Sequence, residues 1–188
     1  MNTMRPVIKG IFVNSHIKFV RQQKGEEGIH TLEQHYGKPL KFKNSDNVPV
    51  CEEVKILEAA LDVLSDKRIP GHERAFEAGR LHFRNFTTTP LAKIIFSLFR
   101  KNFKLMMIQT HNIAGHVFQG VRFSTEELGS SALKVIMENN DYPLDHFRGL
   151  FQEWMDFSGY SGVVEAKETA PNRFEYTMRW KESPSQKK

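Results

Sequence analysis

Hydrophobic positions recur with a helical period in the first half of the chain. The clearest case begins at Thr89 and Pro90, an N-cap followed by the proline that the first helical position favours. The pattern predicts an amphipathic helix whose apolar face joins the core. That face is formed by Leu91, Ile94, Ile95, Leu98 and Phe99, and the polar face by Lys93, Ser97, Arg100 and Lys104. Its apolar runs are far shorter than the ~18 residues of a membrane span.

A second helix is predicted upstream, over the segment HERAFEAGRLHFRNF that starts at His72. Its charged face carries Glu73, Glu77, Arg80 and Arg84 at spacings that allow surface ion pairs. The small residues of the other face admit a close neighbouring helix, or leave space for a ligand beside His82. Further helices are expected at about 12–23, 28–36 and 52–64.

After His111 the period changes from helical to alternating. Two strands are predicted at 116–124 and 131–139, joined by a turn at 125–130. A helix follows at 143–159, and two more strands flank Ala170 to Asn172. The order predicts an α+β fold, with a helical N-terminal half followed by a ββαββ antiparallel sheet unit. We expect one domain over residues 6–181 and a flexible tail at 182–188.

Composition and charge narrow the choice of partners and compartment. Residues 1–44 hold 8 of the 27 basic residues but only 3 of the 22 acidic ones. We interpret this excess as a solvated cationic face, which leaves an acidic partner or an anionic membrane surface open. We do not expect nucleic acid as a partner, because no binding motif accompanies the charge. The only cysteine is Cys51, which excludes an intramolecular disulfide and fits the cytoplasm, and no signal peptide is expected.

Three stretches resemble a domain family of myxobacterial type. They are IKGIFVNSHI near the start, AFEAGRLHFRNFTTTPLAKIIFSLF in the middle and HFRGLFQEWMDFSGYSGVVEAKETAPNRFEYTMRW at the end. That family is similar in turn to a fold shared by haem nitric-oxide-binding domains, TRAPP vesicle-transport subunits and 4-vinyl-reductase-type ligand-binding domains. The resemblance implies a small-molecule sensing or assembly module and a homodimer paired through helices.

The motifs for a particular cofactor are missing from the matching positions. Haem domains of this fold use Tyr-x-Ser-x-Arg, and Tyr160-Ser161 has neither that spacing nor the arginine. Cys51 precedes the helices that would carry an acyl chain in a transport subunit. His111 and His116 lack the spacing of a zinc motif, so no metal site and no cofactor are predicted.

No catalytic constellation emerges, so we do not expect an enzyme. The GYSG at 159–162 lacks the second spacer of a nucleophile elbow and follows a helix instead of a strand. Asp145 and His146 are adjacent on one helix, so their side chains diverge by about 100°. Neither arrangement supports general acid–base or nucleophilic chemistry.

The leading hypothesis is a signalling module that binds an apolar or amphipathic small molecule and a protein partner. Its pocket is expected near His82, Phe86, Ile94, Leu98 and Met106. The competing interpretation of His82 is a hydrogen-bonded core histidine. Two alternatives remain open: a scaffold subunit with a filled core, and a cyclic-dinucleotide receptor. For the latter, the phosphate contacts would come from Arg80, Arg84 and Arg122.

Overall fold

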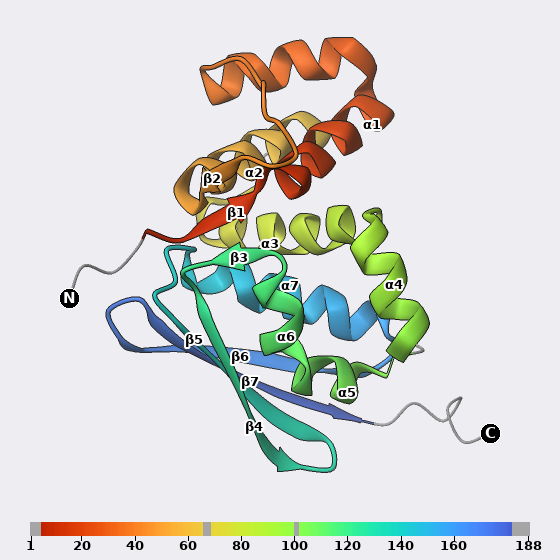
Figure 1. Cartoon of the computed structure of the whole chain (residues 1–188), viewed down its shortest axis with the longest axis vertical. Coiled ribbons are helices and arrows are strands. Elements are labelled where there is room, and N and C mark those ends of the chain that lie inside the picture. The colour runs from red at the N-terminus through yellow and green to blue at the C-terminus, as the bar shows by residue number, and fades with distance from the viewer. Residues whose placement is uncertain (1–4, 66–68, 100–101, 182–188) are drawn as a thin grey trace.

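The computed structural model describes residues 5–65, 69–99 and 102–181, and it shows helices stacked on an antiparallel sheet (Figure 1). The predicted α+β class, with a helical first half and a sheet-rich second half, is confirmed. The tail predicted at 182–188 and Arg100 of the predicted polar face lie outside the described residues. Within the described residues, no helix is long and apolar enough to span a membrane.

Three long helices form the N-terminal half. They are α1 (Gly10–Tyr36), α2 (Val50–Leu64) and α3 (Gly71–Thr87). Helix α1 is interrupted at Gly25, whose φ of 65° and ψ of −159° suit a residue without a side chain. The two helices predicted on either side of that glycine therefore correspond to the two arms of α1.

Three shorter helices lead from α3 to the sheet: α4 (Pro90–Phe99), α5 (Phe103–Ile108) and α6 (Thr110–Gly115). Thr89 Oγ1 accepts the Ala92 N–H at 3.2 Å, which confirms the predicted N-cap. The predicted core face of α4 is only partly right. Ala92 and Ile95 are buried, but Ile94 is 57% exposed and Leu98 69% exposed. Helix α4 lies at the edge of the helical layer, so it is covered along one narrow side (Figure 1).

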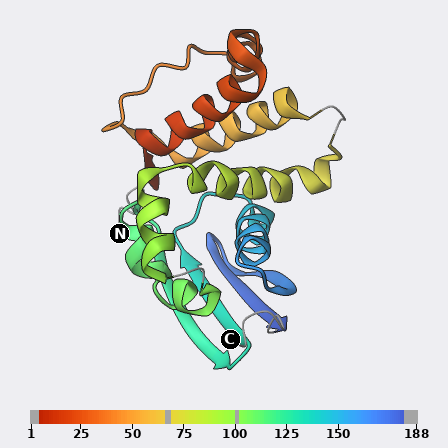
Figure 2. The same cartoon turned by 90° about the vertical axis from the view of Figure 1, so that its right-hand side faces the viewer.

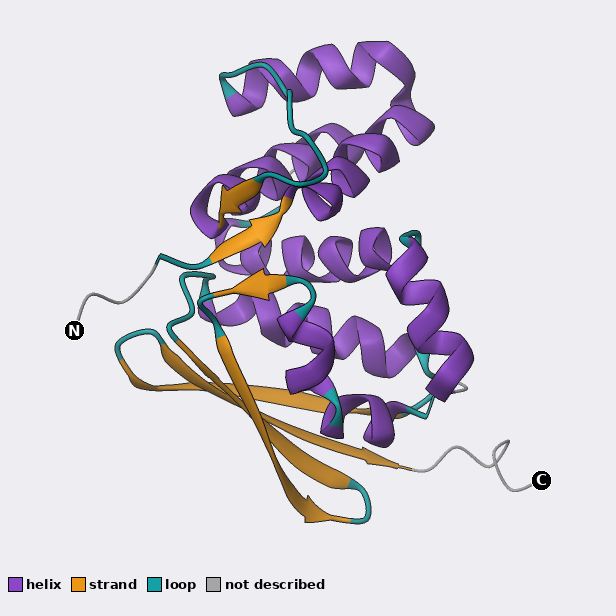
Figure 3. Ribbon diagram, viewed as in Figure 1, coloured by secondary structure: helices purple, strands orange, loops and turns teal. Residues whose placement is uncertain are grey.

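Two antiparallel sheets complete the fold (Figure 3). The small one has the order β2-β1-β3 and contains β2 (Asn47–Pro49), β1 (Val7–Lys9) and β3 (Phe118–Gln119). The large one has the order β4-β5-β7-β6, with strands β4 (Arg122–Gly129), β5 (Ala132–Glu138), β7 (Arg173–Lys181) and β6 (Ser161–Ala170). The predicted turn at 125–130 is wrong in its bounds, because residues 125–129 continue β4 and pair with β5.

Helix α7 (Leu144–Phe157) lies between α3 and the large sheet (Figure 2). Two glycines set how closely it approaches α3. A Cβ on Gly79 would lie 1.8 Å from the His146 carbonyl oxygen, and a Cβ on Gly149 would lie 1.9 Å from the Phe76 carbonyl oxygen. The backbones of α3 and α7 are therefore in contact at their crossing, as the small-residue face of α3 allows. This contact brings the side chains at 82 and 146 together.

Candidate functional site

Six buried polar side chains meet where the N-terminal helices contact α7. Each is at most 3% exposed, although five of the six are titratable: three histidines, one glutamate and one tyrosine. We call them the buried polar cluster. Its members are His16 of α1, Glu53 of α2, His82 and Asn85 of α3, Tyr142 before α7, and His146 of α7.

Glu53 is the centre of the cluster. Its Oε1 lies 2.9 Å from His16 Nε2 and 3.5 Å from His82 Nε2. Its Oε2 accepts a hydrogen bond from the Tyr142 hydroxyl. Two imidazoles from different helices therefore converge on one carboxylate oxygen, while a phenol holds the other.

A second set of contacts involves the other ring nitrogen, Nδ1, of His16 and of His82. His82 Nδ1 lies 3.0 Å from His146 Nε2, and His16 Nδ1 lies 2.9 Å from Asn85 Nδ2. Asn85 Oδ1 and His146 Nδ1 are buried and have no hydrogen-bond partner among the described residues. Buried polar atoms are nearly always paired, so these two atoms mark the cluster as unusual.

Burial decides the protonation of the cluster. Loss of solvation lowers the pKa of His16 to about 3 and that of His82 to about 4, and it lowers the pKa of His146 well below its usual value. The same loss raises the pKa of Glu53, although the nearby His82 and Tyr142 oppose the change. The three imidazoles are therefore neutral at pH 7, and each has one ring nitrogen that donates and one that accepts.

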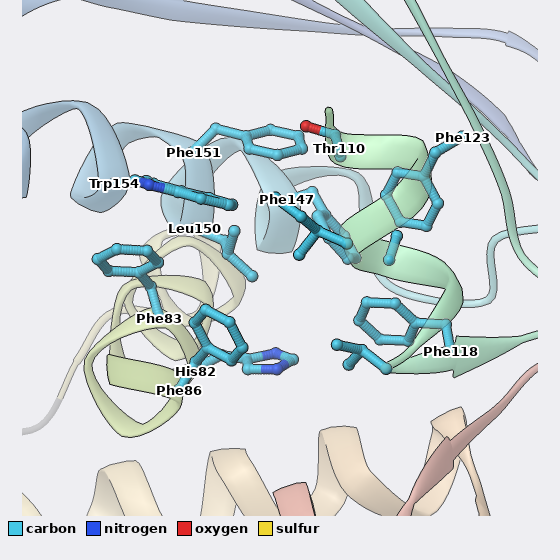
Figure 4. A pocket seen from close by; sticks show the side chains of 13 residues that line it. His82, Phe83, Phe86, Thr110, Phe118, Phe123, Phe147, Leu150, Phe151 and Trp154 are labelled. Atoms are coloured by element: carbon cyan, nitrogen blue, oxygen red, sulfur yellow. The ribbon is translucent and has the colours of Figure 1, made fainter. Parts of the chain in front are cut away.

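An apolar pocket adjoins the cluster and has His82 in its wall (Figure 4). Its volume is about 50 Å³. It lies between α3, α6, α7 and strands β3 and β4, and it is lined by His82, Phe83, Phe86, Thr110, Ile113, Ala114, Val117, Phe118, Phe123, Phe147, Leu150, Phe151 and Trp154. Aromatic rings make up most of this wall, so the pocket suits an apolar occupant.

The predicted pocket residues are only partly brought together. His82 and Phe86 line the pocket. Met106 is fully buried in the core but does not line it, and Ile94 and Leu98 lie exposed on α4, away from it. The pocket wall comes instead from α6 and α7, because α7 and not α4 packs along the inner face of α3.

The predicted anion-binding arginines are already paired with carboxylates. Arg80 Nε donates to Glu153 Oε2 at 2.6 Å, and Arg84 Nε donates to Glu153 Oε1 at 2.7 Å. Arg122 Nε donates to Glu138 at 3.1 Å on the sheet. The hydrogen bonds of Arg80 and Arg84 thus run to α7 instead of to Glu73 and Glu77 on their own helix.

Sequence reasoning found His82 but missed its partners. His16 and Glu53 occupy helix positions whose periodic neighbours, such as Val13, Val20 and Leu57, are buried. A charged or titratable side chain on a core face is the signal that could have revealed them. His146 contacts His82, whereas Asp145 pairs with Arg148, so the expected divergence of Asp145 and His146 is confirmed. His111 and His116 are exposed.

The fold of this chain is similar to that of solved H-NOX domains. An oxygen-binding H-NOX domain related to soluble guanylate cyclases superposes with a TM-score of 0.65 at 15% identity, covering 93% of this chain and 95% of that one. An Fe(II) unliganded H-NOX mutant from K. algicida gives 0.65 at 12% identity, covering 94% and 98%. A structure concerned with haem redox potential and porphyrin distortion gives 0.64 at 16% identity, covering 96% and 98%. At these identities the likeness shows the fold alone.

The residues of this chain do not fit a haem. The pocket of about 50 Å³ is well below the ~300 Å³ at which pockets for larger organic ligands begin. Packed rings occupy the space, with the centroids of Phe118 and Phe147 5.9 Å apart and those of Phe83 and Trp154 5.3 Å apart. Both ring nitrogens of His82 face other side chains, so neither is directed at an axial position.

Comparison by sequence gives a family assignment. No curated protein matches the chain. A family model described as "Protein of unknown function (DUF2378)" matches residues 2–181, which is nearly the whole chain. The chain therefore belongs to the DUF2378 family.

Proposed function

We propose that this domain is a non-catalytic sensing module that binds a small apolar molecule in the pocket, without haem. The observation that carries the proposal is that His82 belongs to two features at once. It forms part of the pocket wall, and it is a member of the buried polar cluster. An occupant that displaces this imidazole changes contacts to α1, α2 and α7 together. Binding is thereby coupled to the packing of four helices.

The size of the pocket limits the ligand. A volume of about 50 Å³ has room for roughly three to five water-sized spheres. The occupant is therefore a molecule of a few heavy atoms, or a larger one that moves the surrounding rings. The H-NOX likeness supports the gas-sized class, because one of those structures is an oxygen complex.

Xenon is a suitable first probe because it enters dry apolar cavities. We expect the ¹²⁹Xe resonance of a solution of the wild-type protein to shift in proportion to protein concentration. The variant Ala114→Leu places three more carbon atoms in the pocket wall and should abolish most of this specific shift. The control Ala166→Leu adds the same atoms on β6, outside the pocket, and should keep it.

Two outcomes contradict the ligand proposal. If xenon shifts equally with wild type and Ala114→Leu, the pocket is not its site. If neither the wild type nor the enlarged variant Leu150→Ala binds xenon or benzene, the interior is effectively filled. In both cases the scaffold interpretation would replace the sensing one.

Homodimerisation through α4 is the second part of the proposal. Ile94 and Leu98 are 57% and 69% exposed on one side of this helix, an apolar surface that a second copy would cover. We expect light scattering to give a dimer mass. Leu98→Glu should shift it toward the monomer, whereas Lys93→Glu, also exposed on α4, should have little effect. A monomeric wild type at tens of micromolar concentration would contradict the dimer.

A further inference from the structure

Three side chains in the buried polar cluster have the composition and spacing of a metal site. The ligand atoms that His16, Glu53 and His82 offer all lie within 4.8 Å of one another, and all three residues are buried. Two imidazole nitrogens with one carboxylate oxygen form a ligand set that zinc and non-haem Fe(II) sites use. The three ligands come from α1, α2 and α3, so the fold and not a local sequence motif creates the set.

Two of the three distances between the ligand atoms are close to those within a coordination sphere. Metal–nitrogen bonds of about 2.0 Å and metal–oxygen bonds of about 2.1 Å at tetrahedral angles place neighbouring ligand atoms about 3.3 Å apart. Glu53 Oε1 lies 2.9 Å from His16 Nε2 and 3.5 Å from His82 Nε2. The ligand atoms of His16 and His82 lie within 4.8 Å of each other, so an ion bound between the three residues would draw their ligand atoms together.

Each of the three ligand side chains also contacts one further polar group through its second polar atom. Tyr142 donates to the second oxygen of Glu53, His146 contacts His82 Nδ1, and Asn85 contacts His16 Nδ1. Metal-bound histidines and carboxylates characteristically have such outer partners, which fix ring orientation and tautomer.

The unpaired oxygen of Asn85 supports the same arrangement. The amide oxygen and nitrogen of an asparagine are interchangeable by rotation of the side-chain amide. With Oδ1 turned to His16, it would accept the Nδ1–H proton and leave the lone pair of Nε2 free for a metal. Oδ1 would then have a partner and Nδ2 would take its unpaired place, while His16 would be in the tautomer that coordination requires.

The buried charge of Glu53 is an independent argument for a bound metal ion. Both ion-pair partners of Glu53 among the described residues are histidines, and neither carries a fixed positive charge. A buried carboxylate is costly unless a cation or a proton balances it. A divalent ion bound to its Oε1 would supply that balance.

We infer that His16 Nε2, Glu53 Oε1 and His82 Nε2 bind one divalent transition-metal ion, of the Zn²⁺ or Fe²⁺ class. Tyr142, His146 and Asn85 form the supporting shell. His82 also lines the apolar pocket, so the proposed metal site and the pocket share this residue. The metal site does not depend on the proposed pocket ligand, so either can fail without the other.

The test is a titration of chelator-treated protein with Zn²⁺ and, as a spectroscopic probe, Co²⁺. We expect one equivalent to bind, to produce visible Co²⁺ bands and to raise the melting temperature. Glu53→Gln keeps the shape of the side chain but removes the ligand charge. It should weaken Zn²⁺ binding by more than about 100-fold, since outer partners alone are worth about 10- to 100-fold.

Controls separate this site from adventitious binding. His111→Ala removes an exposed histidine and should leave the stoichiometry and affinity unchanged. Ala114→Leu, which fills the pocket, should keep the metal even if it loses xenon. If Glu53→Gln does not fold, long-range ¹H–¹⁵N spectra of the wild type decide, because Zn²⁺ should shift Nε2 of His16 and His82 but not the ring nitrogens of His111 or His116. Absence of saturable binding, or equal binding by Glu53→Gln, would overturn the inference.

Discussion

The two faces of α3 carry ionisable groups in opposite environments. On the inner face, His82 and its neighbour Asn85 are buried in the cluster around Glu53. On the outer face, Arg80 and Arg84 are partly exposed and share the carboxylate of Glu153. Both faces contact α7. The inner face does so through the buried contact between His82 and His146, and the outer face through the ion pairs with Glu153.

The difference shows why only the inner face is suited to bind a ligand or a metal. At the surface, water solvates the arginines, so they keep their charge. Water also screens their ion pairs with Glu153, so these pairs contribute little to stability. Inside the protein, burial drives the histidines to their neutral form, in which a ring nitrogen can act as a ligand. The outer arginines contact Glu153 of α7, and the inner histidines offer the ring nitrogens that the proposed metal site uses.

The largest effect on the free energy of unfolding is expected from substitutions that separate α3 and α7. Gly79→Ala or Gly149→Ala would place a methyl group within 2 Å of backbone atoms of the other helix, and should destabilise the domain by about 3 kcal/mol or more. Gly71→Ala, at the start of α3 with open space around it, is the control. It should be neutral or slightly stabilising in urea unfolding. Equal effects at positions 71 and 79 would show that the crossing is not tightly packed.

A matched pair of tyrosines compares a buried with a surface hydrogen bond. Tyr142 and Tyr36 each donate to a glutamate, at Glu53 and Glu52 respectively. Tyr142→Phe leaves a buried carboxylate oxygen unpaired and should cost about 1–3 kcal/mol. Tyr36→Phe leaves an oxygen that still accepts from Lys38, and should cost about 0.5 kcal/mol. Chemical denaturation measures both, and equal costs would contradict the contrast between the two environments.

The smallest effect is expected at the outer ion pairs. Burial disfavours ionisation of Glu153, but hydrogen bonds from Arg84 and Arg80 outweigh it and lower the carboxyl pKa. A lowered pKa in the folded state stabilises the protein above the unfolded pKa of about 4.5, and this contribution is lost as the pH falls further. Glu153→Gln should therefore cost about 1 kcal/mol or less at pH 7.

The pH and salt dependence of that variant test the assignment. The difference in unfolding free energy between wild type and Glu153→Gln should shrink below about pH 4.5 and in high salt. A difference that stays constant from pH 7 to pH 3 would show that the variant acts through packing instead of charge.

Local signals explain which elements were predictable from the sequence. The N-cap at Thr89 and the alternation in β7 depend on neighbouring residues, so pattern reasoning found them. Strands β1, β2 and β3 are two or three residues long and exist because Val7 and Ile8 pair with residues more than 35 positions away. The exposed face of α4 could not be foreseen either, because periodicity shows that a face is apolar but not what covers it.

The candidate site was harder to predict because its contacts join residues that are far apart in the sequence. His82 stood out because it lies among small residues on a predicted helix, and its hydrogen bond to His146 agrees with the core-histidine interpretation. The convergence of His16 and Glu53 on it depends on how three helices pack, which no spacing encodes. The outer arginines were recognised as a charged group, but their partner Glu153 is on α7, about 70 residues away.

The long sequence separations within the cluster have a consequence for folding. Its contacts join residues 37, 64, 69 and 89 positions apart. Closing such loops costs chain entropy before any contact repays it, so contacts of this kind form late. The cluster can be complete only after α7 has docked on the N-terminal helices. A ligand that binds there therefore stabilises the forms in which α7 is docked over partly folded forms in which it is not.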